Sequence, residues 1–210
     1  MKNQSIPSPV LWRLSLYLRQ LEHLATKGFE KTSSRKLAEA LQTTDAQVRK
    51  DLAYFGQFGR PGVGYRVGEL IGQLRHILRT DRLWKVILVG VGDLGRALLR
   101  HKSFRRNGFE LIAAFDTSPE LIGSSVAGVT VRPMRQLSDV VGKLEIKLAV
   151  VAVPPDVAQG VTDLLCRAGI LGVLNFAPTS LHAPDGVTIR QVDLAAQLEQ
   201  LSFHVGAAED

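Results

Sequence analysis

The segment Lys85–Leu99, KVILVGVGDLGRALL, constrains the fold of this chain more than any other, because an apolar strand, a glycine-rich turn and a helix follow one another in it. The turn Gly90-Val91-Gly92-Asp93-Leu94-Gly95 has the spacing of a dinucleotide-binding loop. Its first glycine allows a tight turn, its second lets a pyrophosphate approach the backbone, and its third lets the helix pack on the strand. The free N–H groups of the helix then face the phosphates. By itself, such a triplet also fits an ordinary glycine-rich turn.

A second apolar run supports the dinucleotide interpretation. Leu111–Phe115 leads directly into Asp116, which lies 21 residues after Gly95. A carboxylate at this place binds a ribose 2′-OH and repels the extra phosphate of NADP(H). We therefore expect NADH and NAD⁺ as cofactors.

The second part of the chain alternates between strand and helix patterns. The expected strands are 85–90, 110–116, 129–132, 146–153, 172–176 and 187–192, and the expected helices are 94–101, 134–142 and 156–168. Apolar strands of this kind belong to a parallel sheet that is covered on both faces. The pattern predicts an α/β fold, a Rossmann-like doubly wound parallel sheet over residues 85–192.

Ligands of such sheets lie beyond the carboxyl ends of the strands. We therefore expect a cofactor crevice lined by Val153, Pro154, Asn175, Phe176, Ala177 and Pro178. Each of these prolines also fits simple strand termination.

The basic residues of the chain lie mostly before the glycine-rich loop. Residues 1–85 hold 15 Lys and Arg against 7 Asp and Glu, a net charge of +8, whereas the remaining residues hold 11 against 13, a net charge of −2. The net charge of +6 of the whole chain therefore comes from the first part. A basic excess confined to one part indicates a polyanionic partner for that part. A solvated basic surface without a partner is the alternative.

Three helices are predicted at the start of the first part. A helix starts after Ser8 and ends near Gly28, a second starts at Ser33 or Ser34, and a third follows the turn Gln42-Thr43. Thr44 and Gln47 have the spacing of a capping box at the start of the third helix.

The outer face of the third helix is polar and basic, with Gln47, Arg49 and Lys50. Arginine and glutamine on such a face make bidentate contacts to guanine and adenine edges in the major groove. Two helices joined by so short a turn indicate a helix-turn-helix whose second helix reads DNA.

Residues 56–66 contain too much glycine for a helix, and we interpret them as a hairpin, the wing of a winged-helix domain. Arg60 at its tip is placed to enter a minor groove, while Tyr65 returns toward the body. A helix over 67–78 then closes an N-terminal winged helix-turn-helix domain, residues 1–84. A protein–protein helical module is the alternative for the whole unit.

A last helix follows Asp193 and carries one apolar stripe, Leu194, Leu198, Leu201 and Val205. The stripe packs either on its own domain or on a partner subunit. A helix-turn-helix protein usually dimerises to match a palindromic site in double-stranded DNA. We expect a homodimer in which residues 193–210 form a C-terminal dimerisation helix and tail.

Other classes of protein fit the sequence less well. The nucleotide part leaves no room for the substrate domain of a dehydrogenase, and its histidines are scattered, so we expect no enzyme. The single cysteine, Cys166, excludes an intrachain disulfide and a cysteine-rich metal site, and we expect no metal. Without a membrane-length apolar run or a signal-peptide core, the expected compartment is the cytoplasm.

A series of short motifs follows in order along the chain: Ser33-Ser34, Gln47-Val48-Arg49-Lys50-Asp51-Leu52, Tyr54-Phe55-Gly56, Phe58-Gly59, Gly62-Val63-Gly64-Tyr65, the glycine triplet, Phe115-Asp116, Asn175-Phe176-Ala177-Pro178 and Val192-Asp193-Leu194. In these motifs the chain resembles the Rex family of bacterial redox-sensing transcriptional repressors. The resemblance implies a repressor that senses the NADH/NAD⁺ ratio, is released from its operator by NADH and exchanges C-terminal helices in a homodimer. It also implies DNA-binding residues, namely Ser33, Gln47, Arg49, Lys50, Arg60, Gly62 and Tyr65.

The resemblance further implies a switch. Arg19 and Asp193 match residues that the family pairs between subunits in its DNA-bound form. His101 stands where the family has a tyrosine, and Gln42 stands where it has a glycine. Protonated His101 would compete with Arg19 for Asp193, or it is a solvated residue at a helix end. Two other functions stay open: a regulator with a structural or different dinucleotide ligand, and a small oxidoreductase with a basic appendage.

Overall fold

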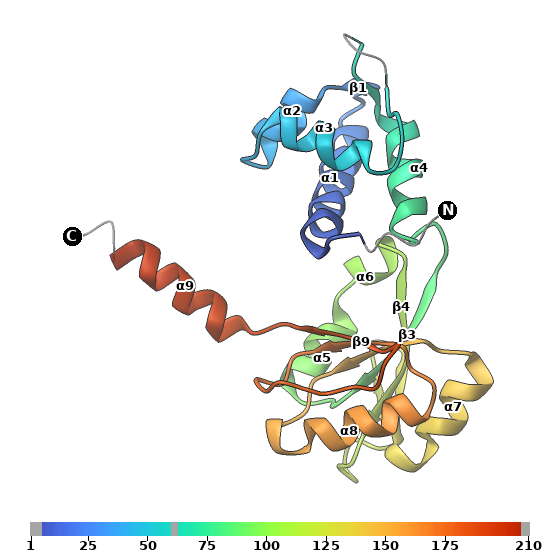
Figure 1. Ribbon diagram of the computed structural model, residues 1–210. Coiled ribbons are helices and arrows are strands. Elements are labelled where there is room, and N and C mark those ends of the chain that lie inside the picture. Colours follow the sequence, from blue (N-terminus) through green and yellow to red (C-terminus); the bar gives the residue numbers. More distant parts are fainter. Residues whose placement is uncertain (1–5, 60–62, 207–210) are drawn as a thin grey trace. The chain divides into compact units, whose positions relative to one another are not determined.

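The computed structural model describes residues 6–59 and 63–206 of the chain (Figure 1). The chain forms two compact units, Met1–Arg82 and Leu83–Asp210. Each has its own apolar core. In the described residues, no helix is long and apolar enough to cross a membrane.

The first unit consists mainly of helices. Its elements are α1 (Ser8–Thr26), β1 (Lys31–Thr32), α2 (Ser34–Ala40), α3 (Asp45–Ala53), β2 (Tyr65–Arg66) and α4 (Val67–Ile77). The buried side chains Leu14, Tyr17 and Leu21 of α1 share a core with Leu70 and Leu74 of α4. The apolar spacing read from the sequence therefore gives the packing of the unit correctly, although α1 starts at Ser8 itself, with Pro7 as its N-cap.

The two short helices begin at side-chain caps. The Ser33 hydroxyl accepts a hydrogen bond from Lys36 N at 3.2 Å, and the Thr44 hydroxyl accepts one from Gln47 N at 3.1 Å. The reciprocal half of the predicted capping box does not form, because the Gln47 amide donates to Asp51 at 2.7 Å instead. The second helix of the pair is thus capped from one side only.

The turn between α2 and α3 needs a left-handed residue. Gln42 has a φ of 52°, a conformation that costs a residue with a Cβ about 1–2 kcal/mol. This strain explains physically why the resemblance places a glycine here.

The predicted hairpin over residues 56–66 is wrong in its pairing. The strand β2 pairs antiparallel with β1, joining Thr32 to Tyr65 and Lys31 to Arg66, and residues 56–59 form no strand. Gly64, with a φ of 80°, lets the backbone pass so close to Thr32 that a Cβ would lie 2.3 Å from its carbonyl oxygen. The expected wing tip, with Arg60 and Gly62, lies outside the described residues.

The second unit is built on a seven-stranded sheet in the order β5-β6-β4-β3-β7-β8-β9. Its strands are β3 (Trp84–Val89), β4 (Phe109–Asp116), β5 (Ser125–Val126), β6 (Val129–Pro133), β7 (Leu148–Val151), β8 (Gly172–Asn175) and β9 (Thr188–Gln191). All neighbours pair in parallel except β5 and β6. Without β5, this order is that of a Rossmann sheet, which confirms the predicted fold class.

Helices connect the strands of this unit. They are α5 (Asp93–Arg100), α6 (Ser103–Arg106), η1 (Met134–Gln136), α7 (Leu137–Leu144) and α8 (Pro155–Arg167). The predicted strand 146–153 is too long, because regular pairing in β7 stops at Val151. The elements α6 and β5 were not predicted, because they are too short to show a periodic pattern.

The last helix, α9 (Leu194–Gly206), has no buried residue. Its apolar side chains Leu194, Leu198, Leu201, Phe203 and Val205 are 57–73% exposed. Figure 1 shows α9 in red, extending away from the sheet. Of the two alternatives for its apolar stripe, packing on its own domain does not occur in the described residues.

Candidate nucleotide and nucleic-acid sites

The glycine-rich loop joins β3 to α5. At two of its positions the packing of the protein backbone leaves no room for a side chain. A Cβ on Gly90, whose φ is 93°, would lie 2.2 Å from the carbonyl oxygen of Ala152. A Cβ on Gly95 would lie 2.0 Å from the carbonyl oxygen of Gly90, so the helix packs closely on the turn. Both glycines have the roles that the sequence predicts.

Gly92 differs from both. A Cβ on it would meet no protein atom within 4 Å, and its φ is −66°. Gly92 is the N-cap of α5 and makes no side-chain cap. The glycine leaves open space at the start of a helix, where backbone N–H groups and the helix dipole attract a phosphate.

Asp116 ends β4 beside this loop. Its two carboxylate oxygens accept hydrogen bonds from Val91 N at 2.7 Å and from Ser118 N at 2.8 Å. The carboxylate is therefore tied to the glycine-rich loop.

The expected crevice residues divide into two groups. Val153 and Phe176 are half-buried, and Pro154 and Pro178 are exposed at the ends of the neighbouring strands. Asn175 and Ala177, in contrast, are buried, at 0% and 1% exposure.

Asn175 holds the loop after β8 together. Its amide nitrogen donates to the carbonyl oxygens of Ala177 and Thr179, both at 3.1 Å, and to Oε1 of Gln191 at 2.6 Å. Its amide oxygen accepts from Ala177 N at 2.9 Å. The side chain shapes the crevice wall, and its polar atoms are used within the chain.

The helix α3 and the following loop border a groove of about 620 Å³. It is lined by Ser33, Ser34, Arg49, Leu52, Ala53, residues 56–59, Val63, Gly64 and Tyr65. Tyr65 is 9% exposed, and burial raises the pKa of its hydroxyl. Of the expected DNA-binding residues, Arg49 and Lys50 are exposed, Ser33 and Gln47 are half-buried, and Tyr65 belongs to the core.

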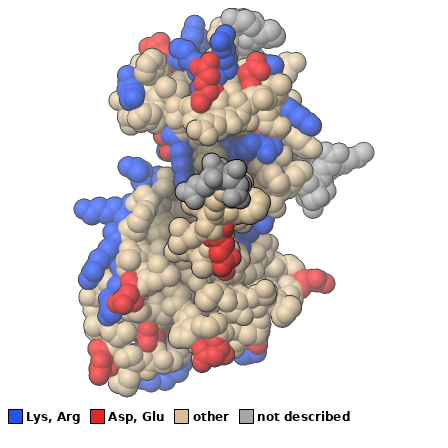
Figure 2. All heavy atoms as spheres, turned by 90° about the vertical axis from the view of Figure 1, so that its left-hand side faces the viewer, with Lys and Arg blue, Asp and Glu red and all other residues tan. Residues whose placement is uncertain are grey.

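Figure 2 shows blue Lys and Arg side chains on the first unit, at the top of the view, with red acidic side chains among them; other blue side chains lie on the second unit. Two acidic residues of α3 carry much of the local geometry of the first unit. Asp45 lies on the surface of the helix, and Asp51 is buried beneath it.

Asp51 forms a buried polar cluster that the sequence did not reveal. The carboxylate, 1% exposed, accepts two hydrogen bonds from Arg13, at 2.5 and 2.7 Å, and one from the Tyr17 hydroxyl at 2.8 Å. Gln47 adds the fourth. Burial raises the pKa of Asp51, but these hydrogen bonds outweigh it and hold the pKa below its ordinary value. The cluster ties α1 to α3.

The expected switch residues lie in different units. Arg19 is exposed on α1, while Asp193 precedes α9 and accepts a hydrogen bond from Ala196 N at 3.1 Å. His101 follows α5, where its Nδ1 lies 2.7 Å from the Ser103 hydroxyl and its ring lies 5.3 Å from that of Phe104. Among the described residues, no group of three or more potential ligands is arranged to hold a metal ion.

Comparison with known proteins agrees with this division of the chain. Residues 5–53 match the family model described as "Putative DNA-binding protein N-terminus", and residues 81–179 match the one described as "CoA binding domain". A redox-sensing transcriptional repressor Rex from Carboxydothermus hydrogenoformans is 43% identical over 205 residues, covering 98% of this chain and 99% of that protein. Its counterpart from Desulfitobacterium hafniense is 44% identical over 206 residues, covering 98% of each.

The chain belongs to the Rex family.

The solved structures of Rex proteins give the same result. This chain is similar to RSP, described as a Rex-family repressor, in the structure of RSP in complex with beta-NAD⁺ and operator DNA. The TM-score is 0.92 and the sequence identity is 36%, covering 99% of this chain and 95% of that one. RSP in complex with beta-NADH has a TM-score of 0.89 and 34% identity, over 99% and 97%. Rex proteins are named as regulators, which confirms the prediction that the chain is not an enzyme.

Proposed function

We propose that this Rex protein represses transcription by binding operator DNA through its first unit, and that NADH binding in its second unit releases the DNA. The main support is the open space at Gly92, at the start of α5, in the glycine-rich loop to which Asp116 is hydrogen-bonded. The other unit of the same chain is a helix-turn-helix. Similar proteins have been solved with NAD⁺ and operator DNA and with NADH.

In the second unit, residues 85–192 bind the nucleotide. The loop from Gly90 to Gly95 receives the pyrophosphate, Asp116 accepts the ribose 2′-OH, and Val153, Pro154, Phe176 and Pro178 line the crevice, with Asn175 and Ala177 supporting its wall. Burying the cationic nicotinamide of NAD⁺ beside apolar groups costs more than burying that of neutral NADH. NADH therefore binds more tightly.

In the first unit, Gln47, Arg49 and Lys50 face the major groove, and Ser33, Tyr65, Arg60 and Gly62 support or extend the contact. Two such units, related by a two-fold axis, read a palindromic operator. The dimer forms through α9, since its apolar stripe has no partner in the described part of its own chain. The protein is located in the cytoplasm, where a DNA-binding repressor has access to its operator.

The switch requires that NADH prefers the released arrangement of the dimer, because a ligand shifts an equilibrium only by its differential affinity. Pairing of Arg19 with Asp193 of the other subunit stabilises the DNA-bound arrangement. His101, which follows the cofactor-binding helix, is the third residue that we place in this switch.

A selection from random duplex DNA with the wild-type protein identifies its operator. Operator affinity is then measured at fixed total nucleotide while NADH replaces NAD⁺. Loss of binding as the NADH fraction rises supports the proposal. Equal affinity at all ratios refutes redox sensing and favours the alternative, a structural or different dinucleotide ligand.

The dimer has its own test. The double variant Leu198→Asp/Leu201→Asp places two charges on the apolar stripe of α9. We expect its sedimentation coefficient to fall from that of a dimer to that of a monomer. Glu199→Gln, on the same helix but outside the stripe, is the matched control and is expected to stay dimeric. A dimeric double variant would contradict the role of α9.

A further inference from the structure

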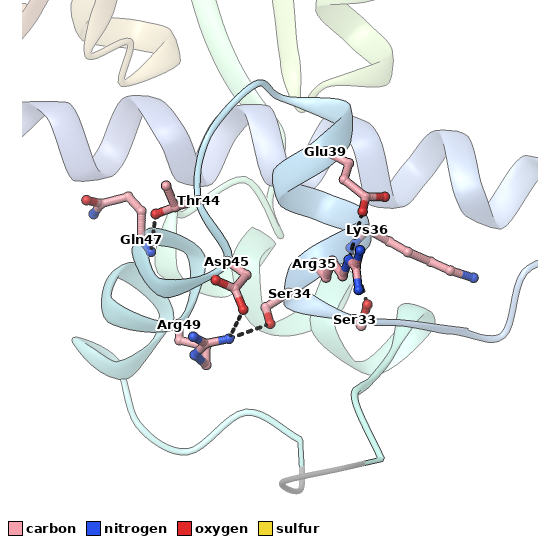
Figure 3. A network of polar contacts seen from close by, with 9 residues as sticks. All are labelled: Ser33, Ser34, Arg35, Lys36, Glu39, Thr44, Asp45, Gln47 and Arg49. Atoms are coloured by element: carbon pink, nitrogen blue, oxygen red, sulfur yellow. Dashed lines mark hydrogen bonds and ion pairs between the residues drawn. The ribbon is translucent and has the colours of Figure 1, made fainter.

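The guanidinium of Arg49, on the recognition helix, is held from one side only. Its Nη1 donates to Oδ2 of Asp45 at 2.5 Å and to the hydroxyl of Ser34 at 3.2 Å (Figure 3). Because Nη1 carries two hydrogens, these two acceptors satisfy it. Nε and Nη2 have no acceptor among the residues that the structure describes.

Nε and Nη2, the nitrogens without an acceptor, together form one edge of the guanidinium. Nε and Nη2 donate in parallel, which matches the two acceptors O6 and N7 of guanine. The side chain of Arg49 is 54% exposed, so this edge is accessible from solvent. The contacts that hold Arg49 thus leave free the part of it that reads a base.

Arg35 on α2 shows the opposite arrangement. Its Nε donates to Glu39 at 3.0 Å, so the ion pair occupies the bidentate edge itself (Figure 3). Both pairs join residues four positions apart on a surface helix. The two arginines therefore differ in which edge their carboxylate leaves open, and Arg49 alone has an additional acceptor from a second helix, Ser34 of α2.

We propose that Asp45 and Ser34 are positioning residues, which fix Arg49 before DNA arrives so that its Nε/Nη2 edge reads a guanine in the operator. This inference rests on the proposed DNA-binding function. A long side chain loses rotamer freedom when it is immobilised at an interface, and holding it in place beforehand reduces that loss. The hydrogen bond from Arg49 also lowers the pKa of Asp45, so the carboxylate is charged at neutral pH.

A simple charge effect predicts a different result. Removing a carboxylate near DNA strengthens binding to any sequence, because phosphate repulsion decreases. Positioning, in contrast, affects the contact to the base. The ratio of operator affinity to the affinity for a scrambled duplex of the same length therefore separates the two effects, since the electrostatic contribution is common to both duplexes.

The test measures this ratio at one salt concentration for the full-length dimer, with the operator selected by the wild-type protein. We expect Asp45→Ala to lower the ratio about three- to tenfold, as for the loss of one immobilised side chain. Ser34→Ala is expected to lower it less, and Asp45→Asn, which keeps an acceptor for Nη1, is expected to retain most of it. In an Arg49→Ala background, Asp45→Ala is expected to leave the ratio unchanged.

Glu39→Ala is the matched control. It removes a carboxylate from an ion pair of the same spacing and changes the net charge equally, and we expect it to leave the ratio unchanged. An unchanged or increased ratio in Asp45→Ala would overturn the proposal, since Asp45 would then act by charge alone or as a competitor for Arg49. If the wild-type protein selects no sequence, the proposed function fails instead, which keeps the two failures distinct.

Discussion

Replacing Gly92 with alanine tests the nucleotide site without disturbing the fold. A Cβ at this position meets no protein atom within 4 Å, and the φ of −66° suits any residue. Alanine restricts the unfolded chain, which stabilises by about 0.4–1 kcal/mol. Alanine is also a poorer N-cap than glycine, by a similar amount. The two effects nearly cancel, so we expect the thermal midpoint to stay within about 3 °C of wild type.

Binding is expected to respond quite differently. A methyl group placed where the pyrophosphate approaches costs about 1–3 kcal/mol by overpacking, which weakens NADH binding about 5- to 150-fold. Calorimetry on Gly92→Ala, with a thermal melt of the same sample, measures both quantities. Gly95→Ala is the control: its Cβ, 2.0 Å from Gly90 O, forces α5 to move and lowers both stability and affinity. Unchanged NADH affinity in Gly92→Ala would refute the placement of the pyrophosphate.

Three further variants can be tested. Asp51→Asn is expected to destabilise the first unit by about 3–5 kcal/mol, because it breaks a buried ion pair with Arg13. Since the pKa of Asp51 is lowered on folding, its contribution is present above the ordinary value of 3.8 and is lost as the pH falls through the folded pKa, so acid unfolding followed by circular dichroism should be less steep in the variant. Gln42→Gly is expected to stabilise by about 0.5–1 kcal/mol in urea unfolding, since it relieves a left-handed φ. Asp116→Asn is expected to raise the affinity for NADPH relative to NADH in paired titrations, and an unchanged preference would contradict its role at the ribose.

Features encoded by residues close in sequence were predictable. The glycine-rich loop requires Gly90 and Gly95 because a Cβ at either position would clash with nearby backbone. The apolar runs of the central strands are typical of a parallel sheet, and they predict it without the strand order. The N-cap Thr44 was equally predictable, because a cap involves residues only three positions apart. For the helix before it, the sequence left Ser33 and Ser34 open as the start, and the structure shows Ser33 as the N-cap.

Features that depend on distant residues were not. The Asp51 cluster joins positions 38 and 34 residues apart, and nothing local to Asp51 distinguishes it from a solvated helix residue. The same cluster draws the Gln47 amide away from the predicted capping box. The pairing of β1 with β2 involves two residues from each strand, too few to produce an alternating pattern. The contacts of Arg13 and Tyr17 with Asp51 and the pairing of β1 with β2 both join distant parts of the chain.

The short ladder between β1 and β2 has a consequence for the dynamics of the first unit. It joins Lys31–Thr32 to Tyr65–Arg66 and so closes a loop that contains α2, α3 and the segment after them. Opening these few hydrogen bonds would release both ends of that loop together. We therefore expect the amides of α2 and α3 to exchange with solvent as one cooperative unit, and any ligand that holds one of these elements to slow exchange in the other.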